Sequence, residues 1–367
     1  MKEISRFNVP TGTIVVCEGD NGRLEFLSIG DYGKDVNLNK DTVVPDDLPL
    51  LPLTDKLVIT ISTQYGCSMG CQFCDVPKVG PGTNCTLNDL QQQVIHGLSV
   101  YPSVKYSNRL NIHYARMGEP SWNPSVLDHA KWMKEHIDPE YNVHPVLTSM
   151  MPAKNEWLKT FIHTWVRIKN RVYRGNAGLQ LSINSTSENE RLKIFSKNAL
   201  PLHAIAKIMD GCIPVGRKFT LNFPVANWEV DPCVLSRYFD PSHWIVKLTP
   251  MHETATAKRF GHHTVGDYTN PEAYKEIADS CKREGFEVLV FIASRDEDEG
   301  MITCGNAVLA SQKTQKVPRA RIGPLSFMGG SEIGRTPFRS WSEQKDPYHV
   351  DLVESNISLD MREKGTT

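Results

Sequence analysis

Apolar residues along most of the chain follow two alternating periods, which predict strands and helices in turn. Short β-branched runs, such as Leu57-Val58-Ile59-Thr60-Ile61, predict buried strands. Stretches with apolar residues three or four positions apart, such as Trp157, Phe161 and Trp165, predict amphipathic helices whose apolar side packs into the core. The expected strands are 57–61, 109–114, 144–148, 179–183, 218–223, 244–248 and 286–292, and the expected helices are 86–98, 124–134, 153–168, 188–194, 202–209, 232–238 and 271–284.

This alternation predicts an α/β fold built on a parallel sheet with right-handed crossovers. The pattern holds six strand–helix units and a closing strand. Six units are too few for a closed barrel of eight strands. We therefore expect a partial (β/α)6 barrel, with its active site at the carboxyl ends of the strands.

The two ends of the chain differ from this middle region. Strand-like residues 13–16 and 24–27 flank Asp20-Asn21-Gly22, a turn sequence typical of a hairpin. Residues 38–56 are polar and proline-rich, as in a linker, and no clear periodicity follows residue 312. The expected parts are a small β-rich N-terminal element and linker over 1–50, the partial barrel over 51–312, and a C-terminal extension or cap over 313–367.

Composition predicts a cytoplasmic protein. Hydrophobic residues make up 40% and charged residues 23% of the chain, as in ordinary globular proteins. No apolar stretch approaches the roughly 20 residues that span a bilayer, and the first ten residues lack the apolar core of a signal peptide. The net charge of −1 gives no overall basic signal for nucleic acid, and we interpret the basic residues between 167 and 174 as a solvated face.

Three of the nine cysteines, Cys67, Cys71 and Cys74, lie within eight residues in the spacing C-x3-C-x2-C. They follow the first strand of the repeating units, so they are expected on a loop at the catalytic end. Three thiolates can hold three irons of a [4Fe-4S] cluster and leave the fourth iron open for a small ligand. Zinc is the competing interpretation, but a structural zinc site takes four ligands, and no second CxxC or HxxxH pair is evident.

This spacing, with the aromatic residue Phe73 before the third cysteine, resembles the signature of the radical S-adenosylmethionine (SAM) superfamily. The resemblance implies an enzyme with two cofactors, a [4Fe-4S] cluster and SAM. One electron cleaves SAM to a 5′-deoxyadenosyl radical, which abstracts a hydrogen atom. The electron would come from an external donor of the flavodoxin or ferredoxin type.

Residues at the other strand ends support this resemblance. Glu119, in the sequence Met117-Gly118-Glu119-Pro120, can accept a hydrogen bond from the ammonium group of SAM, and Gly118 lets the backbone approach the ligand. A simple turn is the alternative interpretation of Gly-Glu-Pro. Donors for the ribose and carboxylate of SAM are expected from the ends of the third and fourth strands, at Ser149, Ser182 and Asn184.

A closer resemblance is to the radical SAM methyl synthases of the RlmN/Cfr type, which methylate carbon 2 or carbon 8 of adenosine in RNA. It runs from about residue 47 to 308 and rests on the segments 62–67, 117–123, 181–184 with 190–191, 247–250, 295–296 and 304–305. It implies that Cys304 is methylated by one SAM, and that a second SAM activates this methyl group for addition to an aromatic carbon. Asp47 stands where the family has a glutamate proposed as a base, and His252 where it has an asparagine that contacts SAM.

The chain also departs from this family. Thr60 replaces a second cysteine, seven residues before Cys67, which in the family helps to release a crosslink between protein and substrate. Another thiol such as Cys85 takes its place, or the crosslink is resolved differently, or the reaction itself differs. Asn184 replaces a histidine, and the family's helical N-terminal RNA-binding domain is not recognisable.

Three functions follow as hypotheses. The first is a methyltransferase that uses Cys304 to methylate an sp2 carbon of an adenosine-type base in RNA. The second is a radical SAM enzyme that abstracts hydrogen from a small molecule, nucleotide or peptide without a methyl-cysteine. The third is a non-catalytic iron–sulfur protein that binds SAM. A metal site at His252, His262 and His263 is less favoured, because these residues lie in a polar loop without helical ligand spacing.

Overall fold

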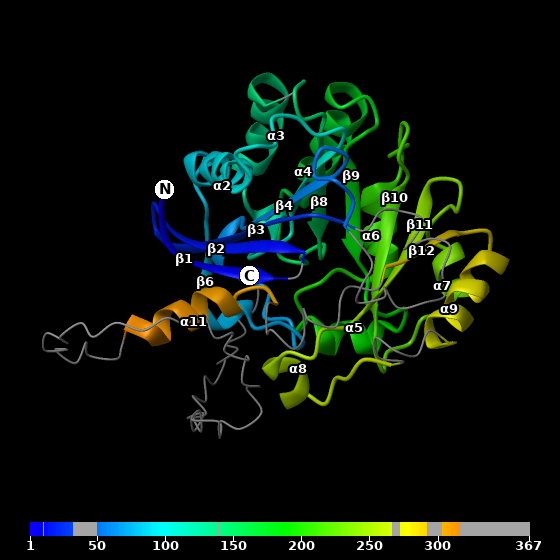
Figure 1. The fold of residues 1–367 in the computed structure, drawn as a ribbon. Helices are drawn as coiled ribbons and strands as arrows, with labels where there is room; N and C mark the ends of the chain where they lie inside the picture. The colour runs from blue at the N-terminus through cyan, green and yellow to red at the C-terminus, as the bar shows by residue number, and fades with distance from the viewer. Residues whose placement is uncertain (10, 32–49, 138, 266–271, 292–302, 316–367) are drawn as a thin grey trace, which may run out of the picture. The chain divides into compact units, whose positions relative to one another are not determined.

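The computed structural model describes residues 1–9, 11–31, 50–137, 139–265, 272–291 and 303–315 (Figure 1). All of them belong to one compact unit, Met1–Pro318. Asp47, the segment 295–296 and nearly all of the expected C-terminal extension lie outside the described residues.

Seven parallel strands form the centre of one large sheet (Figure 1). Their order along the sheet is the order of the sequence, as expected for successive right-handed crossovers. They are β4 (Leu57–Ile61), β7 (Leu110–Tyr114), β8 (Val143–Ser149), β9 (Gly178–Ser182), β10 (Phe219–Val225), β11 (Trp244–Pro250) and β12 (Glu287–Val290). All seven strands were expected from the sequence, so the predicted α/β class is confirmed.

Helices alternate with these strands. They are α2 (Leu87–Ser99), α3 (Ser125–His136), α4 (Leu158–Arg167), α5 (Glu188–Ile194), α6 (Leu202–Met209), α7 (Pro232–Ser236), α8 (Ala255–Arg259), α9 (Glu272–Arg283) and α11 (Asn306–Gln315). The start of α2 follows from its sequence. The Thr86 hydroxyl accepts a hydrogen bond from the backbone of Asp89, and the Asp89 carboxylate accepts one from the backbone of Thr86.

The N-terminal hairpin is confirmed, and it extends the main sheet. Strands β1 (Lys2–Val9), β2 (Gly12–Gly19) and β3 (Gly22–Ile29) pair antiparallel, and β3 then pairs antiparallel with β4. Strand β1 was not expected, because its polar residues are half exposed at the edge and give no apolar alternation. Whether residues 1–50 form a separate domain stays a prediction.

The expected core positions Phe161 and Trp165 are fully buried, and the Trp165 indole donates a hydrogen bond to the carbonyl of Gly178, 3.0 Å away. Helix α4 begins five residues later than expected, at Leu158, because Asn155 folds the preceding segment into a turn and accepts a hydrogen bond from the backbone of Trp157. A π-helical turn, Ile168–Val172, continues the helix. There Lys169 turns inward and donates to the carbonyl of Val215, so this residue of the basic run is buried and the expected solvated face does not include it.

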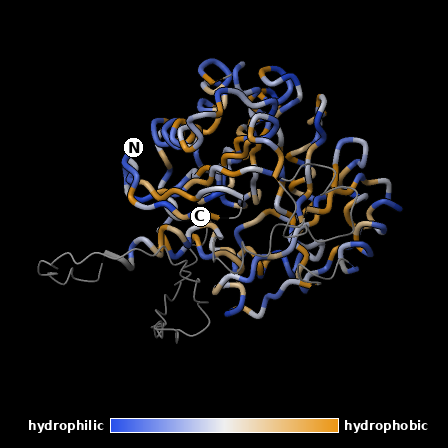
Figure 2. The backbone as a smooth tube through the Cα atoms, viewed as in Figure 1, coloured by the Kyte–Doolittle hydropathy of each residue, from blue (hydrophilic) through white to orange (hydrophobic). Residues whose placement is uncertain are grey.

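Hydrophobic residues follow the strands through the interior, and hydrophilic residues lie mainly along the outer loops and helix surfaces (Figure 2). In the part of the chain that the structure describes, no helix is both long and apolar enough to cross a membrane. Helices α5 and α8, which follow β9 and β11, lie at the carboxyl end of the sheet (Figure 1). The loop with the three clustered cysteines also belongs to this end, since it follows β4.

Candidate functional site

The cysteine loop is fixed by a small two-stranded sheet. Strand β5 (Gln64–Gly66) leads into Cys67 and pairs with β6 (Pro81–Asn84). Gly66 has φ of +81°, and a Cβ atom there would lie 2.0 Å from the carbonyl oxygen of Gly80. Only glycine fits this close approach, which places the Cys67 backbone N–H 3.1 Å from that oxygen.

The three thiols lie close enough to influence one another. Burial raises the pKa of Cys67 to about 12. Burial, and then the neighbouring sulfurs of Cys67 and Cys74, raise the pKa of Cys71 well above its ordinary value. Such thiols stay protonated unless a strong positive charge binds them as thiolates. The loop therefore has the chemistry of a metal or cluster site.

This donor set fits a cluster better than a single ion. In the described ranges, no group of three or more His, Cys, Asp or Glu side chains has the geometry to surround one metal ion. Three cysteines match the attachment of a cubane whose fourth iron is open, whereas a structural zinc site takes four ligands.

An apolar shell surrounds the loop. The Phe73 ring packs edge-on against Phe195 and Trp228, with ring centroids 6.1 and 5.6 Å apart. Met69 and Met251 belong to the same buried group. A shell of this kind excludes water and tunes the reduction potential of a cluster. The aromatic residue before the third cysteine therefore packs at the wall of the site.

Glu119 is held at the end of β7, facing the end of β8. Its carboxylate accepts hydrogen bonds from the Ser149 hydroxyl and the Met150 backbone, both at 2.8 Å, and from the Ser121 backbone at 3.1 Å. Two of these donors reach Oε1 and one reaches Oε2, so Oε2 is the more open of the two oxygens. Burial raises the pKa of Glu119, although these hydrogen bonds act in the opposite direction.

Gly118 is required for this arrangement. Its φ is +96°, and a Cβ atom would lie 2.6 Å from the Cβ of Gln64. The Gln64 side chain in turn accepts a hydrogen bond from the Glu119 backbone, 3.0 Å away. The glycine thus serves the packing of β5 against β7. A direct approach of Gly118 to a ligand stays a prediction. A direct contact of Ser149 with SAM also stays a prediction, because the Ser149 hydroxyl donates its hydrogen bond to Glu119.

Asn184 has an unusual environment just after β9. It has φ of +66° and is 1% exposed, yet neither its amide nitrogen nor its amide oxygen has a hydrogen-bond partner in the described structure. The side-chain oxygen of Asn222, on β10 beside Ser182, is likewise buried without a partner. An unsatisfied buried amide costs about 1–3 kcal/mol. Such groups mark a place where a bound ligand completes the hydrogen bonding.

The loop after β11 is bound to the cysteine loop, which the sequence did not indicate. The Thr254 hydroxyl donates to the carbonyl of Phe73 at 3.0 Å, and the buried carboxylate of Asp75 accepts from the Thr256 backbone at 3.2 Å. His262 bridges Trp228 and Gln72, at 3.1 and 3.2 Å. Helix α8, which begins beside Thr254, was not expected, because five residues are too few for a clear helical period.

His252 stands at the beginning of this β11 loop, where its carbonyl accepts a hydrogen bond from the backbone of Thr254 at 2.9 Å. The structure therefore places His252 next to residues that contact the cysteine loop. A contact between its imidazole and SAM stays a prediction.

Cys304 lies at the same end of the sheet as the cysteine loop. Its sulfur is 3.7 Å from the carbonyl oxygen of Ala115, directly after β7. Burial is the main cause of the raised pKa values of Cys67 and Cys74, and the nearby Cys304 sulfur raises them further. Residues from opposite parts of the sequence therefore converge at one place. Only a resemblance to known proteins suggested this, since local pattern says nothing about distant contacts.

Two charged residues beside Cys304 were missed in the sequence. Arg116 and Glu25 form an ion pair with Nε and Oε1 2.6 Å apart, and their side chains are 4% and 0% exposed. A weak signal existed, since Glu25 stands inside the apolar run Leu24–Leu27 of β3 and a charge on a buried face requires a partner.

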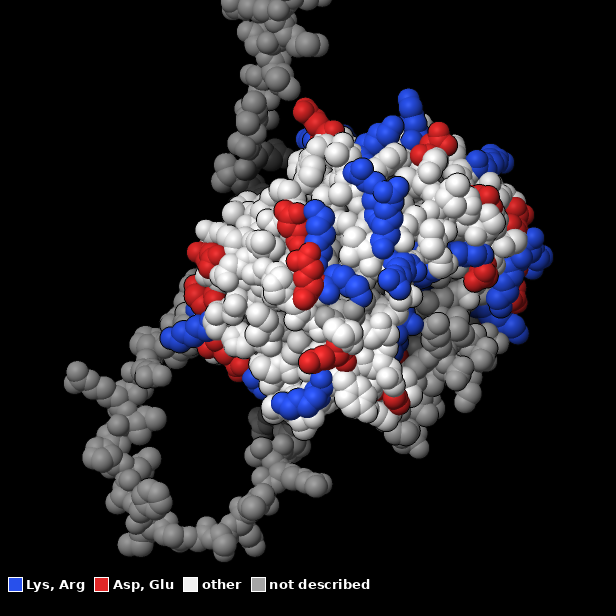
Figure 3. Space-filling model, turned by 90° about the horizontal axis from the view of Figure 1, so that it is seen from above, with Lys and Arg blue, Asp and Glu red and all other residues white. Residues whose placement is uncertain are grey.

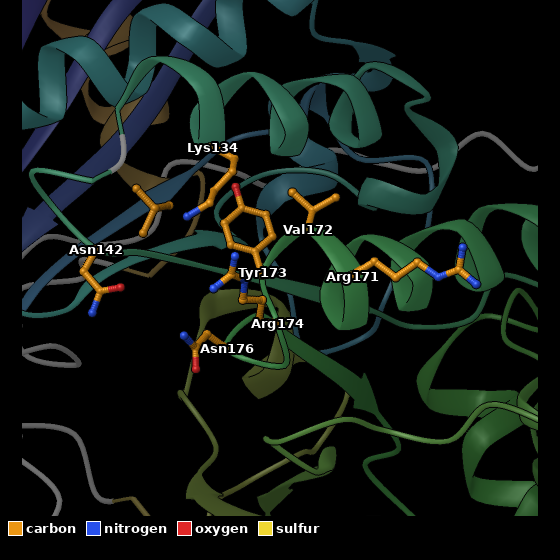
Figure 4. A pocket seen from close by; sticks show the side chains of 8 residues that line it. Lys134, Asn142, Arg171, Val172, Tyr173, Arg174 and Asn176 are labelled. Carbon is orange, nitrogen blue, oxygen red and sulfur yellow. The ribbon is translucent and has the colours of Figure 1, made fainter.

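Two described cavities lie elsewhere. One of about 410 Å³, lined by Lys134, Arg171 and Arg174 among others, is at the amino ends of β8 and β9 (Figure 4). Lys and Arg side chains gather near the middle of one face of the molecule, with Asp and Glu side chains mostly around them (Figure 3). The cavity is at the opposite end of the strands from the cysteines and is not part of the candidate site.

Comparison with known proteins agrees with the fold and the motifs. The chain is 26% identical over 172 residues to a ribosomal RNA large subunit methyltransferase Cfr of Lachnoclostridium phytofermentans, covering 46% of this chain and 45% of that protein. It is 28% identical over 161 residues to a probable dual-specificity RNA methyltransferase RlmN of Prochlorococcus marinus, covering 43% and 42%. The chain therefore spans less than half the length of these curated relatives. No family model matches it.

Among solved structures, a radical SAM methyltransferase from Sphaerobacter thermophilus superimposes with a TM-score of 0.59 and 16% identity, covering 83% of this chain and 80% of that protein. The predicted fold class and the resemblance to the RlmN/Cfr type are thereby confirmed. At this identity the structural likeness establishes the fold, and the chemistry has to be argued from the site.

Proposed function

We propose that the chain is a radical SAM methyltransferase that binds a [4Fe-4S] cluster through Cys67, Cys71 and Cys74. In this proposal it transfers a SAM-derived methyl group through Cys304 to an sp2 carbon of an adenosine-type base in RNA. The observation that carries the proposal is the position of Cys304 beside the cysteine loop, 3.7 Å from the end of β7. A methyl carrier has to lie within reach of the SAM that the cluster binds.

The remaining residues of the site have complementary tasks. Glu119 offers its more open oxygen, Oε2, to the ammonium of SAM, and the unpartnered amide of Asn184, with Ser182 nearby, offers donors and acceptors to its ribose and carboxylate. A cluster held by the three cysteines would supply one electron for the cleavage of SAM, and it would receive that electron from an external donor of the flavodoxin or ferredoxin type. Phe73 and its aromatic neighbours keep water from this reaction.

RNA is proposed as the substrate because the relatives named above are RNA methyltransferases. Cytoplasmic location and the role of Asp47 as a base accompany this proposal as predictions. A second candidate is a radical SAM enzyme that acts on a small molecule, nucleotide or peptide without a methyl-cysteine. Thr60 favours it, since this β4 residue, in register with His113, replaces the cysteine that the family uses to release its product.

Peptide mass spectrometry on Cys304 tests the proposal. The protein would be reconstituted with its cluster without oxygen and incubated with SAM. We expect one added methyl group on Cys304 in the unchanged protein and in a Cys212→Ala control, which removes a half-buried thiol far along the sequence from the site. An unmodified Cys304 in protein that still cleaves SAM would rule out the methyl-cysteine route and leave the second candidate.

A further inference from the structure

Arg116 contacts two partners with two different nitrogens. Its Nε atom is 2.6 Å from Glu25 Oε1, and its Nη1 atom donates to the sulfur of Cys304 at 3.8 Å. The guanidinium fork is rigid and planar, so fixing one side of it also fixes the direction of the other. The ion pair with Glu25 therefore sets where Arg116 presents its N–H group to Cys304.

Glu25 also holds the backbone that carries Cys304. Its Oε1 atom accepts a hydrogen bond from Gly305 at 2.6 Å, and its Oε2 atom accepts one from Val308 at 3.0 Å. Both N–H groups belong to the start of α11, where backbone donors lack partners within the helix. One carboxylate on β3 thus binds the guanidinium that faces Cys304 and the helix that follows it.

The buried ion pair between Arg116 and Glu25 is expected to add little net stability to the fold. Removing two charges from water costs several kcal/mol per ion, and apolar residues of the same size often stabilise a core better. The contact between Arg116 and the Cys304 sulfur indicates that the ion pair has a chemical role in addition to packing. A guanidinium stabilises a thiolate far more than a neutral thiol.

We propose that Arg116 is a positioning residue that holds Cys304 as a thiolate, ready to accept a methyl group, and that Glu25 fixes Arg116 for this purpose. This inference rests on the proposed function. The thiol first releases its proton to solvent. The thiolate then donates an electron pair to the methyl carbon of SAM, so that an S–CH3 bond forms. The bond from that carbon to the sulfonium breaks, and its electron pair stays on the sulfur of S-adenosylhomocysteine.

The charges around Cys304 make Arg116 the residue to test. Burial raises the pKa of Cys304, and Glu25 acts in the same direction, while Arg116 lowers it. From the cysteine loop, the sulfurs of Cys67 and Cys74 interact with Cys304. The carboxylate of Asp75 is bound to Asn306 of α11, 3.4 Å away. Asp75 is itself paired with Lys78 at 2.7 Å, whereas Arg116 is the cation that contacts the Cys304 sulfur. Its loss leaves burial and Glu25 to oppose the thiolate.

The variant Arg116→Lys separates the two contacts. A lysine keeps a positive charge beside Glu25 but lacks the planar guanidinium fork that presents a second N–H group to Cys304 in a fixed direction. Arg109→Lys, at the opposite end of β7, is the matched control. The rate of alkylation of Cys304 by iodoacetamide is followed by peptide mass spectrometry across a pH series, in reconstituted protein without SAM. We expect the rate near neutral pH to fall about tenfold in Arg116→Lys, with the midpoint moved to higher pH.

A second variant controls for an effect of misfolding on the alkylation rate. The double variant Glu25→Gln/Arg116→Gln removes both charges together, so no unpaired charge is buried, and it should show the same slowed alkylation. Suppose that Arg116→Lys keeps its cluster absorption and shows the same alkylation profile as the unchanged protein. That result overturns the inference, whatever the methylation rate of the variant. Absence of methylation in the unchanged protein instead overturns the proposed function, while the alkylation profile still decides the role of Arg116.

Discussion

Two buried carboxylates at the candidate site, Glu119 and Glu25, are held in opposite ways. Glu119 is bound by a hydroxyl and two backbone N–H groups, all neutral, and its Oε2 atom is the more open of its two oxygens. Glu25 is bound by a full positive charge and two backbone N–H groups. The first arrangement suits the binding of a cationic ligand, whereas the second satisfies the charge inside the protein. Burial alone therefore does not tell a ligand-binding carboxylate from a positioning one, but the charge of its partners does.

The largest loss of activity is expected from substitution of a cysteine in the cysteine loop, because the proposed roles of Glu119 and Glu25 both depend on the cluster. Cys71→Ala removes one of three iron ligands, so we expect loss of the iron–sulfur absorption and of all SAM cleavage. Cys212→Ala, outside the site, should keep both. Anaerobic reconstitution followed by visible absorption and chromatography of 5′-deoxyadenosine measures these effects. A Cys71→Ala protein with a full complement of iron and sulfide would contradict the assignment.

Removing the cation at Glu25 should affect stability strongly. Arg116→Met leaves the Glu25 carboxylate buried without its positive partner, which costs about 3–5 kcal/mol. Because the double variant Glu25→Gln/Arg116→Met buries no charge, it should be more stable than the single variant. Urea unfolding of the three proteins measures the difference, and equal stability of the single and double variants would show that Glu25 is not held by Arg116.

Removing the charge of Glu119 should affect ligand binding more than folding. Glu119→Gln keeps the shape but loses a charge-assisted hydrogen bond to the ammonium of SAM, so we expect affinity for SAM to fall about tenfold to a hundredfold. Equilibrium dialysis of the reconstituted protein measures it. The cluster absorption should be unchanged, because the hydrogen bonds of the Glu119 carboxylate in the described structure go to Ser121, Ser149 and Met150 rather than to a cysteine. Unchanged affinity would remove Glu119 from the SAM site.

The variant Glu119→Gln also allows the stability contribution of Glu119 to be measured as a function of pH. Because the pKa of Glu119 is raised by burial, the folded protein keeps this proton to higher pH than the unfolded chain does. The stabilisation that this gives is fully present below the ordinary pKa of 4.5 and is lost as the pH rises through the raised value. The free energy of unfolding of the unchanged protein, relative to Glu119→Gln, should therefore decline from pH 4.5 upward. A flat difference would mean that burial does not perturb Glu119.

The smallest change in stability is expected at Asn184. Asn184→Gly removes a buried amide without hydrogen bonds and relieves a φ of +66°, so the free energy of unfolding should change by no more than about 1 kcal/mol. Binding of SAM should nevertheless weaken, because the amide is expected to pair with the ligand. A variant that binds SAM normally would show that the unpartnered amide serves another purpose.

Much of the parallel sheet and its helices was predictable because their signals are local. A strand such as Leu57–Ile61 is defined by its own β-branched residues, and α2 by the pair Thr86 and Asp89. The cysteine spacing is likewise contained within eight residues. These elements would be recognised in any protein, because the physical cause lies within the segment itself.

What the sequence did not indicate depends on contacts between distant segments. Glu25, Arg116 and Cys304 lie far apart in the chain, and nothing in the surroundings of any one of them names the other two. Helix α11 was also missed, since its apolar residues have no marked helical period. The resemblance to known proteins singled out Cys304 but not its charged neighbours.

The start of α11 packs directly on the segment that follows the cysteine loop. A Cβ atom at Gly305 would lie 3.1 Å from the Cα of Val76, and Asn306 is bound to Asp75. During synthesis on the ribosome, residues 67–74 emerge long before residues 304–306 do. The start of α11 therefore covers this side of the loop only after the last described part of the chain has joined the fold.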